Sequence, residues 1–579
     1  MFLHGRAALA ALLSALIVVC LPLARAEAQS PPAAPQAARV AWGFDRSNLT
    51  PDPRVRFGVL PNGMRYALMP NPTPAGGLSV RLHLDAGSIV EGKGEQGFMH
   101  LIEHMIFHGS PNIPEGALPM MLAREGLRRW NDFNAFTGHD ETVYLLDLAR
   151  ADARARETAL MLMREIAGGL VFERRAVQGA KAKVREEIAA RDAVQDRLTS
   201  ARDAFFMPGT KLARPVAGSG RSVSRATPEA LRRLYERHYM PSNATLILVG
   251  DIEPAAVEAE IAARFADWQG SAEPAPPPVM ASAARGIKAR LFVDRRAATA
   301  ITIATVEPLG EPDAVAPRDL RFLQHLAGEM LTRRLSGLAA GPDAPFSGGS
   351  SGVYDYLSTA KVAQVELAAR DRDWRRALRA GAAELRRALD GGFSETELAE
   401  QLALSRRSLA RDAAPRTSPA VADAIVDAVG RRLVFTAPDD AAAAEAYLAS
   451  VRLTAVNAAF RASWASPGRL LFVSHNRRVP DAKAAIAAAW ATHTSPVEAR
   501  PPRRSGRGIA GPLNEEAPTS DRSAVAGPGG RDGVGDDRAD AGRAGGGAAG
   551  EDAVAGPLRA RTSPRYRGSS RRRGRGRAA

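Results

Sequence analysis

Cysteine is almost absent from this sequence, since Cys20 is the only one among 579 residues. If the chain is cleaved after residue 26, neither disulfide bonds nor thiolate chemistry can operate in the mature protein. Long apolar runs are also absent beyond the first 26 residues, so we expect no stable membrane insertion after that cleavage. The remainder, in a chain with 45% hydrophobic and 24% charged residues, is long enough for two or more folded domains.

The first 26 residues have the three parts of a secretory signal peptide. A short basic start at residues 1–6 precedes an apolar run at 7–23 and the small-residue cleavage signal at 24–26. An uncleaved membrane anchor is the alternative, but the apolar run is short for one. A lipoprotein anchored at Cys20 would need a small residue before it, and Val19 stands there. Export without cysteines is typical of the bacterial periplasm, where we expect the protein to reside.

The formal net charge of +15 raises the possibility of nucleic-acid binding. Much of the arginine, however, lies at the far end of the chain, in SSRRRGRGRAA, without a recognisable reading module. Residues 493–579 are rich in Gly, Ala, Arg, Asp and Pro and contain few large apolar residues, so they cannot offset the entropy of ordering. We predict a disordered basic tail and no nucleic-acid partner.

Strand and helix patterns alternate through the rest of the chain, which predicts an α+β fold with mostly antiparallel sheets. VRFGVLPNGMRYALMP (55–70) indicates a hairpin, and LSVRLHL (78–84) alternates like a half-buried strand. A second hairpin is predicted within 131–148, followed by helices near 151–169 and 173–191.

The segment from Met240 to Trp268 resembles the segment from Ser466 to Trp490, because both contain a proline, an apolar strand and a helix ending at tryptophan. This repeat predicts two related domains. The expected organisation is a signal peptide (1–26), a Pro/Ala-rich leader (27–40), a metal-binding domain (41–270), a proline-rich linker (271–282), a second domain without metal (283–492) and the disordered tail (493–579).

The most informative stretch is GFMHLIEHMIFHGS, residues 97–110, directly after the strand at 78–84. His100 and His104 are four residues apart on the predicted helix, so both project from one face and can reach one ion. Glu103 lies on the adjoining edge, where a carboxylate can act as general base on a water held by a zinc ion. The competing interpretation is a pair of core histidines on an amphipathic helix. The metal interpretation requires a third ligand.

These residues resemble the motif helix of the insulinase/pitrilysin family, the inverted-zincin metallopeptidases. Residues 134–137 with 141–144 are similar to the substrate-side hairpin of that family, and 239–251 is similar to its closing strand. The three matches occur in the family's order, and the likeness covers nearly all of residues 45–490. The resemblance implies two insulinase-like domains, one Zn²⁺ per chain and an endopeptidase that cleaves peptides or unfolded protein segments.

The family's third ligand is a glutamate about eighty residues downstream, on a helix. Glu186 and Glu187 both fall in the matching segment, and only one of them can face the metal. The resemblance selects Glu187, which matches the final glutamate of the family segment. The chain departs from the family at Ala180, where a supporting glutamate is usual, and the spacing from the motif is slightly longer.

The resemblance also assigns substrate contacts to Asn134, Ala135 and Phe136, because an extended strand beside the metal can pair with a peptide backbone. Ordinary strand packing is the alternative for these three residues. We expect His108 to be an exposed residue at the end of the motif helix and His139 to be a loop residue.

Exported relatives with this pattern commonly contain four such domains around a chamber. The residues after about 519 resemble GC-rich coding DNA read out of frame, so we expect a frameshifted tail and a natural protein that continues. Otherwise a second copy or a partner subunit would complete the chamber. The alternative function is a non-catalytic peptide-binding or assembly subunit of the same family.

Overall fold

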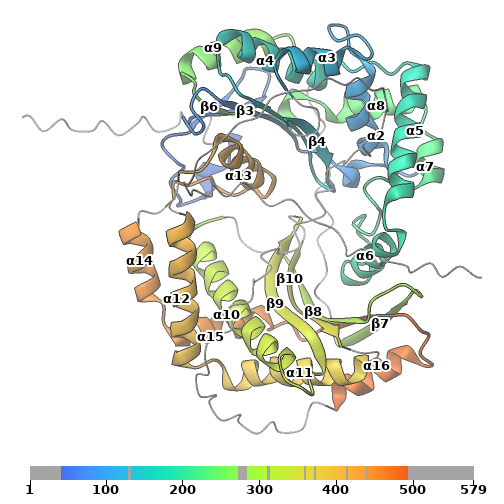
Figure 1. Cartoon of the computed structure of the whole chain (residues 1–579), viewed down its shortest axis with the longest axis vertical. Helices are drawn as coiled ribbons and strands as arrows, with labels where there is room; N and C mark the ends of the chain where they lie inside the picture. The colour runs from blue at the N-terminus through green and yellow to red at the C-terminus, as the bar shows by residue number, and fades with distance from the viewer. Residues whose placement is uncertain are drawn as a thin grey trace, which may run out of the picture. The chain divides into compact units, whose positions relative to one another are not determined.

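The computed structural model describes residues 41–492, except for short stretches at 128–131, 271–282, 284, 310–312, 358–359, 371–372, 413–414 and 439–440. The predicted signal peptide, leader, linker and tail lie outside the described residues and stay predictions. The described part has the predicted α+β architecture, with two sheets and their helices (Figure 1). None of its helices is both long and apolar enough to span a bilayer.

The first sheet has the strand order β1-β2-β6-β3-β5-β4. Strands β2 and β6 run parallel, and the other neighbours are antiparallel. Its strands are β1 (Arg56–Val59), β2 (Arg65–Pro70), β3 (Leu78–Leu84), β4 (Phe133–Thr137), β5 (Thr142–Leu148) and β6 (Ala244–Gly250). The helices of this region are α2 (Phe98–Met105), α3 (Ala117–Arg124), α4 (Ala153–Gly168), α5 (Arg174–Ala190), α6 (Ala193–Phe206), α7 (Gly220–Ser224), α8 (Pro228–His238) and α9 (Pro254–Phe265), with short 3₁₀ turns η1 (Phe44–Arg46), η2 (Ser88–Val90), η3 (Ile106–His108) and η4 (Pro241–Asn243).

The second sheet repeats this plan in the order β7-β11-β8-β10-β9. Its strands are β7 (Ile287–Val293), β8 (Ala300–Pro308), β9 (Phe346–Tyr356), β10 (Ala360–Ala369) and β11 (Arg469–His475). Strand β11 runs parallel to β7, as β6 runs parallel to β2 in the first sheet. The helices are α10 (Val315–Ala339), α11 (Trp374–Gly391), α12 (Glu395–Asp412), α13 (Ser418–Gly430), α14 (Ala441–Ser450), α15 (Leu453–Ser463) and α16 (Ala482–Ala491).

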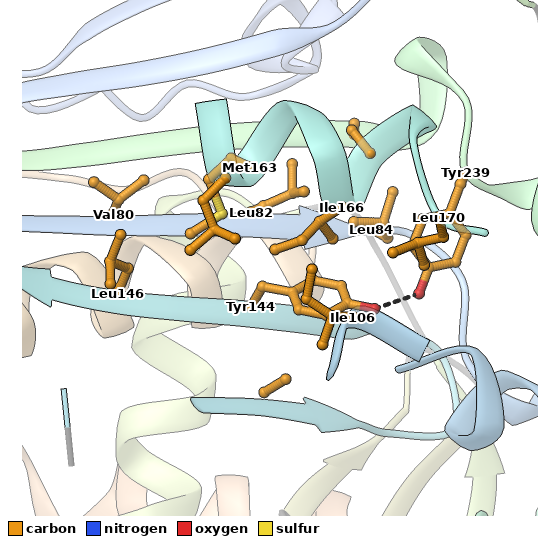
Figure 2. Close-up of a cluster of buried hydrophobic side chains, with 14 of the residues drawn as sticks. Val80, Leu82, Leu84, Ile106, Tyr144, Leu146, Met163, Ile166, Leu170 and Tyr239 are labelled. Atoms are coloured by element: carbon orange, nitrogen blue, oxygen red, sulfur yellow. Dashed lines mark hydrogen bonds between the residues drawn. The ribbon is translucent and has the colours of Figure 1, made fainter. Parts of the chain in front are cut away.

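One face of the first sheet forms the main apolar core of that domain. Successive side chains of a strand point to opposite faces, so Val80, Leu82 and Leu84 of β3 share one face. They lie with residues of β5 and α4, such as Leu146 and Met163, in one buried cluster (Figure 2). Burying such side chains stabilises the fold by about 1.5–3 kcal/mol each. This core fixes the position of the motif helix, because α2 belongs to the same cluster.

The opposite face of the first sheet is covered by α13, which belongs to the second half of the chain (Figure 1). All seven residues of β3 are buried as a result, so the prediction of a half-buried strand was wrong. Arg81 lies on this covered face and donates hydrogen bonds of 2.8 Å to Asp147 on β5 and to Asp423 on α13. A sequence pattern cannot show this cover, because α13 lies more than three hundred residues away along the chain.

The second sheet receives a helix from the first half of the chain in the same way. Phe206 at the end of α6 is buried with Val306 of β8 and Phe472 of β11. The sequence analysis predicted no separate helix at α6. Each domain therefore obtains part of its apolar packing from a helix of the other domain.

Candidate metal centre

The motif helix α2 begins at a glycine that no other residue could replace without strain. Gly97 has a φ of 87°, and a Cβ atom there would lie 2.5 Å from the carbonyl oxygen of Ala217. The carboxyl oxygens of Glu91 accept hydrogen bonds from the backbone N–H groups of Gly97 (3.0 Å) and Met99 (2.9 Å). It thereby satisfies amide groups that a helix leaves free at its N-terminus. All eight residues of α2 are buried, so the helix is held firmly in the core.

His100 and His104 of α2 meet Glu187 of α5. The Oε2 atom of Glu187 lies 3.6 Å from Nε2 of His100 and 3.5 Å from Nε2 of His104. One possible ligand atom from each of the three residues falls within 4.8 Å of the others, and they form the only such group among the described residues. The side chain of Glu186 is 69% exposed and pairs with Lys183 instead. Of the two candidate glutamates, the structure brings Glu187 to the histidines.

The chemistry of these three residues fits a zinc ion. Nε2 of His104 and Oε2 of Glu187 are buried and have no hydrogen-bond partner, and Nε2 of His100 lies 3.6 Å from that oxygen. Buried polar atoms are almost always paired, and orphaned ones grouped together indicate a missing partner such as an ion. Two imidazole nitrogens and a carboxylate oxygen are donors that zinc accepts, with a further position left open in catalytic sites.

The charges at the cluster favour the forms of these side chains that bind metals. Burial, followed by the neighbouring His104, lowers the pKa of His100 to about 3, so its imidazole is neutral at pH 7. Burial alone would raise the pKa of Glu187, but the adjacent His104 and His100 and the nearby Arg191 outweigh it and lower the pKa to about 2. Metal ligands must be deprotonated, and both groups already meet that condition at neutral pH.

Glu103 lies on α2 beside the ligand cluster but outside it. Its side chain is buried, and this burial raises the pKa of its carboxyl to about 7 in spite of the nearby His104 and a hydrogen bond from Thr137. The hydroxyl of Thr137 donates that bond to Oε2 of Glu103 at 2.6 Å. A carboxyl group with a pKa near the working pH suits a general base, because it can both accept and return a proton.

The predicted substrate residues lie on β4, at the edge of the sheet. Asn134 is half-buried, and its Oδ1 atom accepts a 2.9 Å hydrogen bond from the N–H of Ala135. Ala135 belongs to the core cluster that contains α2, whereas the side chain of Phe136 belongs to the cluster under α13. Phe136 therefore points to the face opposite the histidines. Its role in substrate binding, like the roles of Asn134 and Ala135, stays a prediction.

Two other histidines lie outside the ligand group. His108 is at the end of η3, where Nδ1 is 3.4 Å from Oε1 of Glu115, and its side chain is only 20% exposed because it packs near Gly179. His139 lies in the loop between β4 and β5, and its Nδ1 is 3.0 Å from the hydroxyl of Ser88. Ala180 is fully buried in the core cluster, so an apolar contact occupies the place of the family's supporting glutamate.

Three residues around the cluster were not found from the sequence: Glu91, Thr137 and Arg191. Arg191 donates a 2.9 Å hydrogen bond to Oε1 of Glu187, the oxygen that faces away from the histidines. Its spacing of four residues after Glu187 is a signal that could have predicted the contact. Thr137 and Glu91 carry no such signal, because their partners are reached through the tertiary fold.

Comparisons with known proteins identify the family of the chain. The family model described as "Insulinase (Peptidase family M16)" matches residues 66–220, and "Peptidase M16 inactive domain" matches residues 225–404. The probable zinc protease PqqL of Escherichia coli (strain K12) is 32% identical over 206 residues, covering 35% of this chain and 22% of PqqL. The chloroplastic stromal processing peptidase of Oryza sativa subsp. japonica is 30% identical over 241 residues, covering 40% of this chain and 18% of that protein.

Solved structures give the same result for the fold. The first half of the periplasmic protease PqqL from Escherichia coli matches with a TM-score of 0.70 at 23% identity, covering 78% of this chain and 99% of that one. The longer PqqL structure also has a TM-score of 0.70, but this chain covers only 52% of it. The chain thus spans about half of that structure and less than a quarter of the curated relatives named above. With both family models matching in order along it, the chain belongs to the insulinase family, peptidase family M16.

Proposed function

We propose that this protein is a zinc-dependent endopeptidase that hydrolyses peptides or unfolded protein segments. The observation that carries the proposal is the group of His100, His104 and Glu187, in which His104 Nε2 and Glu187 Oε2 are buried and unpartnered, beside the buried carboxyl of Glu103. When bound, zinc would polarise the scissile carbonyl and make an attacking water more acidic. The names of the relatives, several of them zinc proteases, support the same activity.

Glu103 would act as the general base and then as the general acid. In this role its carboxylate takes a proton from the attacking water and afterwards gives it to the leaving amine of the peptide. The hydrogen bond from Thr137 occupies Oε2 and leaves Oε1 for that exchange. Burial excludes bulk water from the carboxyl group and keeps its pKa near 7, which supports proton transfer in both directions.

Among the described residues β4 pairs only with β5, and its other edge would receive the substrate as an additional strand. Residues 132 and 147 form a hydrogen-bonded pair of the β4–β5 ladder, so the backbone groups of Phe133, Ala135 and Thr137 point away from β5. The N–H of Ala135 is bonded to Asn134 Oδ1, and a carbonyl group of an incoming peptide would take that place. Strand addition requires an extended backbone, which is why we propose peptides and unfolded segments as substrates.

The site of action that we propose is the periplasm, after removal of residues 1–26. Support comes from the signal-peptide pattern and from the likeness to PqqL, which is described as periplasmic. Because the chain matches the first half of PqqL almost completely, we also propose that a second copy or a partner subunit completes the substrate chamber.

The test combines zinc content with cleavage of a quenched fluorescent peptide by the purified chain that begins after residue 26. We expect the wild type to hold about one zinc ion and to cleave, with the activity lost on chelation. Glu103→Gln should keep the zinc and lose cleavage, whereas Glu187→Gln should lose both. Glu186→Gln, the matched control on the same helix, should behave as the wild type. Zinc binding unaffected by Glu187→Gln would contradict the proposed ligand set.

A non-catalytic peptide-binding or assembly subunit is the second candidate. It is favoured by Ala180, which fills with an apolar contact the place where the family usually has a glutamate. Outer residues around a metal site commonly affect affinity or activity by about 10 to 100-fold. A wild-type chain that holds zinc and binds the peptide without cleaving it would support this candidate against the first.

A further inference from the structure

We propose that Thr137 is a positioning residue that couples the substrate-binding edge of β4 to Glu103. The inference rests on the proposed peptidase function and deepens it. Thr137 is the last residue of β4, and the predicted substrate residues Asn134, Ala135 and Phe136 precede it directly. No sequence pattern assigns it a role, because the contact with Glu103 joins residues that are 34 positions apart.

The side chain of Thr137 forms a hydrogen bond with Glu103. Its hydroxyl lies 2.6 Å from Oε2 of Glu103, a short distance typical of a hydrogen bond to a carboxylate. Both residues are buried, with 5% of Thr137 and 2% of Glu103 exposed. Next to the ionised form of Glu103, which acts as the base, a hydroxyl can only donate, so the direction of this bond is fixed in that form. The bond holds one oxygen of Glu103 in place.

The backbone of Thr137 faces the edge of β4 that we propose binds the substrate. Thr137 is opposite Thr142 in the β4–β5 ladder. In an antiparallel ladder every second pair is hydrogen-bonded, and the pair of residues 132 and 147 is one of these, so the pair of Thr137 and Thr142 is not. The N–H and C=O groups of Thr137 therefore point to the free edge of β4. A peptide added at this edge would pair with the same residue whose hydroxyl holds Glu103.

In this arrangement the same residue sets the register of the bound peptide along β4 and the orientation of the Glu103 carboxyl group. Catalysis requires the reacting atoms to be held within a narrow geometry, and a displacement of about 1 Å can cost a factor of about 100 in rate. Without the hydroxyl, the carboxyl of Glu103 would be free to rotate while the edge of β4 would still accept a peptide. Loss of the hydroxyl should therefore lower kcat and leave KM nearly unchanged.

The first measurement compares Thr137→Val, Thr137→Ser and the wild type in the peptide cleavage assay. We expect Thr137→Val to lower kcat by about 10 to 100-fold with KM within about twofold, and Thr137→Ser to restore most of the rate. Thr142→Val is the matched control, because it removes a buried hydroxyl that bonds the carbonyl of Ala86 rather than Glu103. It should leave kcat near the wild-type value, and zinc content should be unchanged in all variants.

The second measurement needs no activity. Urea unfolding of Thr137→Val is compared in the wild-type and Glu103→Ala backgrounds, and we expect a clearly larger drop in midpoint in the wild-type background. Equal drops would overturn the contact, and so would a Thr137→Ser variant as impaired as Thr137→Val. A cleaving wild type beside an unimpaired Thr137→Val overturns the positioning role alone, whereas a wild type that does not cleave overturns the proposed function and this role with it.

Discussion

The two domains share one sheet plan, but the pKa values of two buried carboxyl groups near α2 and of two carboxyl groups in the second domain shift in opposite directions. In the first domain, burial raises the pKa of Glu91 to about 8 and that of Glu103 to about 7. In the second domain, burial would do the same to Asp313 and Glu397, but hydrogen bonds from Arg318 and Arg334 outweigh it and lower both pKa values. Asp313 and Glu397 are thus paired with arginines, whereas Glu91 and Glu103 are not.

This difference is consistent with a structural role for the ion pairs of the second domain and with the proposed chemical role of the buried carboxyl groups near α2. The pair of Arg334 on α10 with Glu397 on α12 connects two helices of the second domain. Nε2 of His104 and Oε2 of Glu187 are instead buried without a hydrogen-bond partner, which fits the proposed metal site. A strongly perturbed carboxyl beside such a site is the pattern expected of catalytic centres. The contrast can be tested by matched changes in the two domains.

The largest effect is expected from removing a buried histidine in each domain. His104→Ala should reduce zinc from about one ion per chain to a small fraction and abolish cleavage, because it removes a ligand. His475→Ala changes a buried histidine on β11 whose Nδ1 is 3.0 Å from Thr299 Oγ1, and it should keep the zinc. Zinc analysis by atomic absorption measures both. Equal zinc loss in the two variants would remove the distinction between the domains.

A smaller effect is expected from breaking an ion pair of the second domain. Arg334 donates to both carboxylate oxygens of Glu397 and to the carbonyl of Gly392, and only 21% of its side chain is exposed. Arg334→Ala should lower the free energy of unfolding by about 2–3 kcal/mol, because Glu397 loses its partner.

Zinc content and KM should not change in Arg334→Ala. Arg406→Ala, which removes an exposed pair with Glu445, is the control and should leave the urea midpoint unaltered. An Arg334 variant that loses zinc would mean that the second domain supports the metal centre directly.

The smallest effect concerns the pH dependence of stability. The pKa of Glu91 is higher in the folded state than its ordinary value of 4.5, so the folded protein holds this proton more tightly than the unfolded chain. Its contribution is therefore favourable at low pH and is lost as the pH rises toward about 8. We expect a loss of about 2 kcal/mol between about pH 5 and about pH 7 that Glu91→Gln, a permanently neutral analogue, largely removes.

Asp313 should give the opposite sign. Its pKa is lowered in the folded state, so its contribution is present near neutral pH and is lost as the pH falls through the acidic range. Asp313→Asn should therefore flatten the acid side of the stability profile and not the neutral side. Urea midpoints across pH measure both variants. Parallel profiles for Glu91→Gln and Asp313→Asn would contradict the contrast between the domains.

Sequence reasoning found the parts of the site that depend on local spacing. His100 and His104 follow from helical periodicity, and the family resemblance selected Glu187 over Glu186, which the structure places toward solvent. Their role as ligands stays a prediction, as does the substrate role of Asn134. The α+β class and the two insulinase-like domains are confirmed.

The parts that were missed depend on contacts between distant segments. Thr137 reaches Glu103, and Glu91 reaches the start of α2, only after β3, β4 and α2 have packed together. The alternation of β3 predicted one exposed face, because a strand pattern records polar residues such as Arg81 and not the helix that covers them. Errors in predicted burial are therefore expected where a helix from one domain covers the sheet of the other.

Helix α13 packs on the first sheet and α6 packs on the second, so neither domain has a complete apolar core by itself. A fragment ending before residue 271 would leave the face of the first sheet under α13 without its cover, and the complementary fragment would lack α6. Apolar surface exposed in this way promotes association of the fragments. The repeat visible in the sequence is therefore not a pair of independent folding units. The two domains should therefore melt in one transition.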